Sequence, residues 1–401
     1  MKARYKKFIL DFKRPSGTSR GVMKKKETWF LIVEEQGRFG IGECGLFRGL
    51  SADNVVDYEA KLQWTCANIG MGKDALWEAL RDFPSIQFGV EQAFLSLRSA
   101  VSSYSDAPSQ PGASTRSNIP LMAKAPKRLE STSQREVNFQ FDDQSPKSAS
   151  HDPFLLFASD FTEKGSPIPI NGLIWMGDEG FMHDQIQEKL EAGFRCIKMK
   201  IGAISFEKEI ALLASIRKKY TAAQIELRVD ANGAFTPEDA LVKLEQLAYY
   251  QLHSIEQPIR QGNREAMRQL CATTPLPIAL DEELIGVSSV TEKEKLLQTI
   301  QPQYIILKPS LIGGYRGSQE WIDLADKMGI GWWVTSALES NIGLNAIAQW
   351  TYVLESNMPQ GLGTGSLFAN NFESPLEVEG GKLYYRKAKI WQDNLIQKLC
   401  T

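Results

Sequence analysis

The chain has 401 residues, with 46 lysines and arginines against 48 aspartates and glutamates, and a formal net charge of −2 at pH 7. This length exceeds one ordinary domain and suits a parallel barrel of about 250 residues with an added module. Because the charges balance and no basic stripe alternates with aromatic residues, nucleic acid is excluded as an expected partner.

The cysteines and the apolar segments bear on the cellular location. Five cysteines are scattered without a CxxC pair, which favours free thiols in a reducing compartment. The basic N-terminal segment holds only the short apolar run FIL, and a signal peptide or a membrane span needs a much longer one. We therefore expect a cytoplasmic protein that does not enter a membrane. The sequence leaves the oligomeric state open, with a homo-oligomer among the alternatives.

Residues 1–103 predict an α+β module. Three strand-like runs come first, KARYKKFILDF, ETWFLIVEEQ and RFGIGECG, and the last two are joined through Gln36 and Gly37. Helical patterns follow in VVDYEAKLQWTCANI and VEQAFLSLRSAV. A few antiparallel strands followed by helices are typical of an α+β fold.

Residues 104–165 separate this module from the rest of the chain. Up to residue 150 they are dominated by Ser, Pro, Gln and Asp, a composition typical of a solvated segment. We interpret the stretch as a flexible insertion or linker, and the sequence does not reveal its role.

From Ile168 onward, strand and helix patterns alternate regularly. The strand IPINGLIWMG and the helical stretch FMHDQIQEKLEAG come first. Seven more strand candidates follow: FRCIKMKIG, IELRVDANG, YQLHSIEQP, PIALDEE, YIILKPSL, GWWVTSALES and QGLGTG. Eight strands separated by helices predict an α/β fold of the TIM-barrel type over residues 166–370. The segment 371–401 contains ESPLEVEGGKLYYRKAKIWQ, which predicts strands that return to the N-terminal module.

Charged residues recur at the ends of successive barrel strands. Lys200, Asp230, Glu256, Asp281 and Lys308 are 25 to 30 residues apart, close to the length of one strand and helix unit. The carboxyl ends of barrel strands meet at one mouth, so these side chains should converge there. Three carboxylates suit Mg²⁺, with Mn²⁺ as a second choice, and leave coordination positions for the carboxylate of a small-molecule substrate.

The lysines predict acid–base chemistry. Lys198 and Lys200 lie two residues apart and so point to the same side of their strand. Each positive charge should lower the pKa of the other, and a metal would add to that effect, so that a lysine could act as a base. A metal would also stabilise the enediolate formed when the proton α to a carboxylate is removed. Lys308, four strands further round the barrel, would approach the opposite face of the substrate.

Each of these residues also has a simpler explanation. A single strand-end carboxylate is more often a helix cap or half of an ion pair in a loop, and one Lys-x-Lys is mostly a solvated edge. Five such positions on consecutive strands favour function. Asn232 could reach the same cavity or form a local turn, and Glu282 is expected to support a lysine from outside the metal ligands. None of the three histidines follows a strand beside an aspartate, so a histidine base is disfavoured.

In these motifs the chain resembles the enolase superfamily, whose members pair a capping domain with a modified (β/α)7β barrel. The resemblance covers about residues 1–103 and 165–392 and is carried by KMK at 198–200, VDANGAF at 229–235, SIEQPI at 254–259, LDEE at 280–283 and LKPSLIGG at 307–314. Lysines on the second and sixth strands, without a histidine on the seventh, resemble the muconate-cycloisomerase subgroup. SALESNIGLNAIAQW at 336–350 and PQGLGTGSLFANN at 359–371 resemble the o-succinylbenzoate synthases of menaquinone biosynthesis.

The resemblance implies a Mg²⁺-dependent carbon–oxygen lyase of the hydro-lyase type. Such an enzyme removes water from 2-succinyl-6-hydroxy-2,4-cyclohexadiene-1-carboxylate to give 2-succinylbenzoate. Lys200 would be the base, Lys308 would stabilise the enediolate from the other face, and Lys198 would assist at the metal-bound carboxylate. The metal ligands would be Asp230, Glu256 and Asp281.

The resemblance also implies how the rest of the substrate is held. Ser336 and neighbouring backbone amides would bind the succinyl carboxylate. The loop of residues 14–21, which includes Arg20, should close over the site from the capping domain, as should the segment around Phe47 and Arg48; a plain surface turn is an equal reading of the loop. The insertion departs from the family pattern and bears on domain packing more than on chemistry.

Three other readings stay open. An N-succinylamino acid racemase or a dipeptide epimerase of the same superfamily would use the same two lysines, although the segment 363–365 offers no acidic group to hold the ammonium of a dipeptide. A Schiff-base aldolase would use Lys308 as a nucleophile and would not need a metal. A non-catalytic barrel would be expected to lack one of the site residues, and none is missing.

Overall fold

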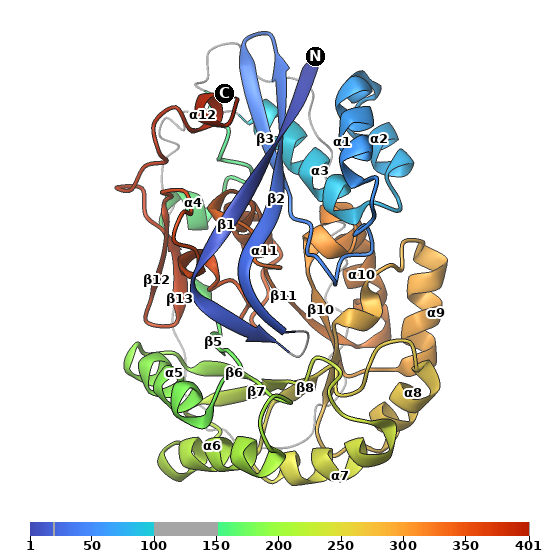
Figure 1. Cartoon of the computed structure of the whole chain (residues 1–401), viewed down its shortest axis with the longest axis vertical. Coiled ribbons are helices and arrows are strands. Elements are labelled where there is room, and N and C mark those ends of the chain that lie inside the picture. The colour runs from blue at the N-terminus through green and yellow to red at the C-terminus, as the bar shows by residue number, and fades with distance from the viewer. Residues whose placement is uncertain (19–20, 100–150, 401) are drawn as a thin grey trace, which may run out of the picture.

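The computed structural model describes residues 1–18, 21–99 and 151–400 (Figure 1). The N-terminal module, residues 1–99, begins with an antiparallel sheet in the order β1-β2-β3. Its strands are β1 (Lys2–Thr18), β2 (Gly21–Glu35) and β3 (Arg38–Cys44). Gln36 and Gly37, with φ of 51° and 76°, form the two-residue turn between β2 and β3, a backbone that a tight hairpin requires. The three predicted strands and their hairpin are confirmed.

Helices cover one face of this sheet. They are α1 (Tyr58–Ala67), the 3-10 turn η1 (Ile69–Met71), α2 (Lys73–Ala79) and α3 (Pro84–Arg98). Glycines in β3 let α3 lie directly on the strand, because a Cβ on Gly42 would come 1.8 Å from the carbonyl oxygen of Gly89. The sequence predicted α1 and α3 and missed α2.

The barrel is built on a parallel sheet whose seven strands follow one another in sequence order. These strands are β5 (Gly172–Ile174), β6 (Cys196–Lys200), β7 (Glu226–Asp230), β8 (Ser254–Glu256), β9 (Ile278–Leu280), β10 (Tyr304–Leu307) and β11 (Gly331–Val334). All seven coincide with predicted strands.

Helices alternate with these strands and form the outer layer of the barrel (Figure 1). They are α5 (Glu179–Glu191), α6 (Phe206–Lys219), α7 (Pro237–Ala248), α8 (Arg264–Thr273), α9 (Val290–Ile300), α10 (Gly314–Met328) and α11 (Asn341–Val353). Thr236 caps α7 as half of a capping box with Asp239, which explains why this helix begins where the sequence predicts. Short 3-10 turns follow the strands at η2 (Glu282–Leu284), η3 (Pro309–Leu311) and η4 (Gly365–Leu367).

The eighth predicted strand, QGLGTG, closes the barrel through isolated bridges. Gln360 pairs with Ile170, and Gly361 pairs with Thr335. The segment is rich in glycine, which weakens regular strand structure because it adds backbone entropy and removes side-chain packing. The architecture is the predicted modified TIM barrel with an α+β capping domain.

The remaining elements lie between the N-terminal module and the barrel, and in the C-terminal segment. They are α4 (Asp160–Glu163), β4 (Ile168–Pro169), β12 (Leu376–Glu379), β13 (Lys382–Tyr385) and α12 (Leu395–Cys400). Strands β12, β13 and β4 form a small antiparallel sheet. Leu395 of α12 packs in one apolar cluster with Phe30 of β2, so the C-terminal segment reaches the N-terminal sheet.

The expected division at residues 103, 165 and 370 stays a prediction. Residues 100–150 of the expected insertion lie outside the described residues. Within its last part, 151–165, the chain forms α4, and Phe161 is buried. No described helix is both long enough and apolar enough to cross a membrane. The cysteines whose side chains are described, Cys44, Cys66, Cys196 and Cys271, are free thiols, as expected.

Candidate active site

A cavity of about 740 Å³ opens at the carboxyl ends of the barrel strands. The predicted residues that line it are Lys198, Lys200, Asp230, Asn232, Lys308 and Ser336. Glu256 and Asp281 lie beside them and are almost fully buried, each with 2 % of its surface exposed. The structure therefore brings together the three lysines and three carboxylates that the spacing of strand ends predicted.

Backbone register places the carboxylates next to one another. Asp230 on β7 pairs with Glu256 on β8, and Asp281 follows the end of the neighbouring strand β9. Lys200 Nζ donates to Asp230 Oδ2 at 2.7 Å. Lys198 donates to Glu256 and Lys308 donates to Asp281. The six charged groups form one buried cluster of alternating sign.

The carboxylates respond differently to this environment. Burial and the negative charge of Asp230 raise the pKa of Glu256 to about 8. Burial also opposes ionisation of Asp230, but Lys200 and Lys198 outweigh it and hold the pKa of Asp230 below its usual range. Of the three carboxylates, Glu256 is the one whose charge the surrounding protein compensates least.

The expected lowering of the lysine pKa is wrong for Lys198. Burial does disfavour its charge, but the neighbouring Glu256 and Asp230 carboxylates more than offset burial and raise its pKa. Lys308 follows the same pattern, because Asp281 and Glu256 raise its pKa against the effect of burial. The carboxylates therefore attract the lysine protons more strongly than burial disfavours them, and this depends on distances that the sequence does not give.

The donor set fits a divalent cation. Among the described residues, no three His, Cys, Asp or Glu side chains already converge closely enough to hold a metal, since each carboxylate is turned to a lysine. All three are hard oxygen donors on adjacent strands, the kind that Mg²⁺ and similar cations prefer. Glu256 Oε1 is buried and has no hydrogen-bond partner in the part of the chain that the structure describes, and such an oxygen is better satisfied by a cation than by apolar surroundings.

Asn232 and Glu282 connect to Lys200. Asn232 has the left-handed φ of 44°, and its side chain accepts from Lys200 Nζ at 2.8 Å and donates to Glu282 Oε1 at 3.1 Å. Glu282 therefore supports a lysine through Asn232. Lys200 is held between Asp230 and Asn232, with its Nζ 5.9 Å from the ring centre of Trp175.

Ser336 lies on the wall of the cavity within a hydrogen-bonded network. Its hydroxyl donates to Glu339 Oε2 at 2.6 Å and accepts from the backbone N–H of Leu338 and from Thr364 Oγ1. Leu338 has the uncommon φ of 66°, a strained backbone for a leucine that the network holds in place. The Ser336 hydroxyl proton is thus committed to Glu339.

The β1–β2 hairpin extends from the N-terminal module to the barrel (Figure 1), and its residues line part of the cavity. Residues 13–16 line the mouth, and Gly17 pairs with Met176 just beyond β5. A Cβ on Gly17 would come 2.4 Å from the carbonyl oxygen of Met176, so this contact requires glycine. Phe47 lines the cavity, whereas Arg48 turns to Glu27 at 2.8 Å. Arg20 lies outside the described residues.

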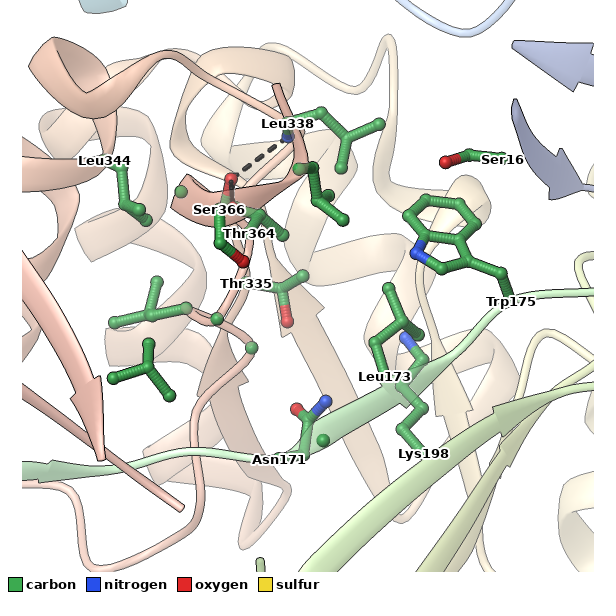
Figure 2. Close-up of a pocket in the computed structure, with 18 of the residues that line it drawn as sticks. Ser16, Asn171, Leu173, Trp175, Lys198, Thr335, Leu338, Leu344, Thr364 and Ser366 are labelled. Atoms are coloured by element: carbon green, nitrogen blue, oxygen red, sulfur yellow. Dashed lines mark hydrogen bonds between the residues drawn. The ribbon is translucent and has the colours of Figure 1, made fainter. Parts of the chain in front are cut away.

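The sequence did not single out several residues that line the cavity. Figure 2 shows Asn171, Leu173 and Trp175 along one strand and Thr335 across from them. The alternation of 171, 173 and 175 places the three side chains on the same face. For Asn171, the sequence signal was a polar residue inside an otherwise apolar strand.

Comparison with known proteins agrees with this site. The family model described as "Enolase C-terminal domain-like" matches residues 182–388. An o-succinylbenzoate synthase of Desulfotalea psychrophila is 44 % identical over 96 % of this chain and 98 % of its own length. The chain belongs to the o-succinylbenzoate synthase family of the enolase superfamily. The MenC crystal structure from Desulfotalea psychrophila LSv54 superposes with a TM-score of 0.73 at 37 % identity, covering 96 % of this chain and 99 % of the other.

Members of the enolase superfamily include enzymes of other activities. The L-Ala-D/L-Glu epimerase of Bacillus subtilis is 28 % identical over 40 % of this chain and 43 % of its own length. Enzymes of the superfamily depend on a divalent metal, which agrees with the donor set of the cluster. Membership excludes the readings as a Schiff-base aldolase and as a non-catalytic barrel.

Proposed function

We propose that this chain is an o-succinylbenzoate synthase that acts in the cytoplasm, in menaquinone biosynthesis. It would remove water from 2-succinyl-6-hydroxy-2,4-cyclohexadiene-1-carboxylate and release 2-succinylbenzoate. The observation that carries the proposal is the 44 % identity to such an enzyme over nearly the whole length of both chains. It is supported by lysines on β6 and just after β10, which border one cavity.

Lys200 is the proposed base. As a free amine it would take the proton α to the ring carboxylate, and the electron pair left on carbon would be delocalised into that carboxylate. The pair then forms the new ring double bond as the neighbouring carbon–oxygen bond breaks, and the departing hydroxyl receives the proton from Lys200 and leaves as water. Asp230 and Asn232 hold the Lys200 amine in place, at 2.7 and 2.8 Å.

Lys308 and Lys198 would act as cations. Lys308 would stabilise the enediolate from the opposite face of the ring as an ammonium group, the usual state of a lysine at neutral pH. Lys198 would lie beside the ring carboxylate. Backbone amides next to Ser336 would hold the succinyl carboxylate on the cavity wall, and the Ser336 hydroxyl, which donates to Glu339, would keep this segment in place.

Mg²⁺ is the proposed cofactor, with Asp230, Glu256 and Asp281 as its ligands. When bound, it supplies the positive charge that makes an α-proton of a carboxylate acidic enough to remove. The three carboxylates are each no more than 2 % exposed, and electrostatic interactions at such buried groups are stronger than in water.

Racemisation of an N-succinylamino acid is the second candidate. Two lysines bordering one cavity could take a proton from one face of an α-carbon and return it to the other. Epimerisation of dipeptides is less well supported, because the stretch 361–367 that lines the cavity has no carboxylate for a substrate ammonium.

The test is formation of 2-succinylbenzoate from the cyclohexadiene substrate. Wild type and Lys200→Ala are compared with Mg²⁺, with EDTA, and after Mg²⁺ is restored, and Lys218→Ala on the exposed side of α6 serves as the matched control. We expect metal-dependent turnover in the wild type and control and its loss in Lys200→Ala. A folded, Mg²⁺-loaded wild type without turnover would contradict the synthase assignment, and racemisation of N-succinylamino acids would then be measured.

A further inference from the structure

Two hydrogen-bonding side chains on the cavity floor have no partner among the described residues. The atoms are Asn171 Oδ1 and Thr335 Oγ1, and both are shielded from solvent. Asn171 has only 5 % of its surface exposed, and both residues line the cavity that contains the lysines. Buried polar groups are normally paired, because an unpaired one loses its hydrogen bonds to water without replacement. The pair therefore points to a ligand that supplies the missing bonds.

The backbone explains the space between these two side chains. Gln360 pairs with Ile170 and Gly361 pairs with Thr335, so the eighth segment runs between the strands that carry Asn171 and Thr335. A Cβ on Gly361 would come 2.3 Å from Thr335 Oγ1. Glycine is needed at 361 because the Thr335 side chain fills the space that a side chain there would take. Figure 2 shows the Thr335 hydroxyl and the Asn171 amide facing each other across the cavity floor, and we call the space between them the slot.

The slot suits a neutral oxygen. The Thr335 hydroxyl donates one hydrogen bond, and the Asn171 amide donates another once its NH₂ faces the ligand, which needs only a half-turn of the amide. Neither side chain is charged. The nearby Lys198 is already paired with Glu256. A buried carboxylate would lack a counter-charge here, whereas a ketone oxygen accepts two hydrogen bonds without one.

The slot lies between the strands that carry the lysines. On one side, Leu173 pairs with Lys198 across β5 and β6, and Asn171 is two residues earlier on the same face. On the other side, the Thr335 N–H donates to the carbonyl oxygen of Leu307, the residue before Lys308.

We infer that Asn171 and Thr335 bind the keto oxygen of the substrate's side chain and thereby determine specificity. The inference rests on the proposed function, whose substrate carries a 2-succinyl group with its ketone next to the ring. Two hydrogen bonds to that ketone fix the orientation of the substrate ring, and so the position of the ring carbon that loses its proton to Lys200. They also select side chains that have a carbonyl at this position.

The experiment compares two ligands of Mg²⁺-loaded enzyme by calorimetry. One is 2-succinylbenzoate, and the other is the same molecule with a methylene group in place of the ketone. We expect the wild type to prefer the ketone about tenfold. Thr335→Val, which keeps the shape and removes the hydroxyl, and Asn171→Leu should each reduce the preference about fivefold. Thr335→Ser should retain it.

Thr291→Val is the matched control, because this threonine is exposed on α9. An unchanged preference in Thr335→Val, or an equal loss of affinity for both ligands, would overturn the inference, and the isosteric valine carries the test alone if Asn171→Leu does not fold. If the wild type forms 2-succinylbenzoate but binds it no more tightly than the methylene analogue, the inference about the slot is wrong and the proposed function stands. A wild type that neither forms nor binds it contradicts the proposed function and the slot with it.

Discussion

The Glu91 carboxylate of the N-terminal module accepts a hydrogen bond of 2.6 Å from the backbone N–H of Tyr315, in the first turn of barrel helix α10. Glu43 does the same for α11, accepting from the N–H groups of Ser340 and Gly343 at 3.0 Å each. Helix N-termini attract negative charge and leave N–H groups without partners. Two carboxylates of the capping domain therefore cap two helices of the barrel and join the domains.

The first prediction concerns the pH dependence of stability at Glu91. Burial raises its pKa to about 7, so between its ordinary pKa and about 7 the folded state holds this proton more tightly than the unfolded state. The contribution to the free energy of unfolding therefore falls as pH rises through this window, by up to about 3 kcal/mol. Glu91→Gln cannot titrate, so its urea midpoint should fall less between pH 5 and pH 8 than that of the wild type.

The control for this measurement is Glu245→Gln, at an exposed position on α7. It should follow the wild type at both pH values. Parallel changes in all three proteins would mean that Glu91 is already ionised in the folded protein at pH 5.

The second prediction concerns the close contact of β3 and α3. Gly42→Ala places a methyl group 1.8 Å from the carbonyl oxygen of Gly89, and relieving that overlap must move the helix that carries Glu91. Overpacking of this kind costs about 3 kcal/mol, so the melting temperature should fall clearly. Gly70→Ala is the matched control, because nothing lies within 4 Å of its added Cβ. Equal melting temperatures for the two variants would show that α3 shifts without cost.

These contacts mark the limit of what the sequence could predict. The strand-end residues from Lys200 to Lys308 were predictable because barrel topology converts regular spacing into proximity. Glu43 and Ser340 are 297 residues apart, and no local pattern in either segment predicts their contact. Tertiary caps of this kind depend on how whole domains dock.

The cavity shows the same division. The carboxylates and lysines carry charge at the ends of consecutive strands, a pattern uncommon enough to predict a functional site. Asn171 and Thr335 are single polar residues in apolar strands, a pattern that buried, fully paired side chains also produce. The pKa of Lys198 was predicted in the wrong direction because its sign depends on distances to Glu256 and Asp230, which spacing alone does not give.

The third prediction tests Asn232 as a positioning residue for Lys200. Asn232→Gly removes the amide that joins Lys200 to Glu282 and accommodates the φ of 44°, which glycine adopts without strain. Loss of an outer hydrogen bond of this type typically costs about 10–100-fold in activity. We expect that loss in kcat, with KM little changed and the pH profile of kcat shifted.

Asn394→Gly is the matched control for this variant. Asn394 also has a left-handed φ, of 56°, but is exposed near the C-terminus. It should keep the wild-type kcat. A kcat that stays at the wild-type value in Asn232→Gly would show that Asp230 alone positions the Lys200 amine.

The fourth prediction concerns metal binding in the absence of substrate. Asp230, Glu256 and Asp281 are each no more than 2 % exposed and lie side by side, and a ligand that binds only the folded state stabilises it. Mg²⁺ at about 100 times its Kd adds about 2.7 kcal/mol, so the melting temperature of the wild type should rise by a few degrees. Glu256→Gln removes one charged ligand and should lose most of that rise, whereas Glu294→Gln, exposed on α9, should keep it. Because the readout is stability, an equal rise in the two variants would exclude Glu256 as a ligand whatever the activity of the enzyme.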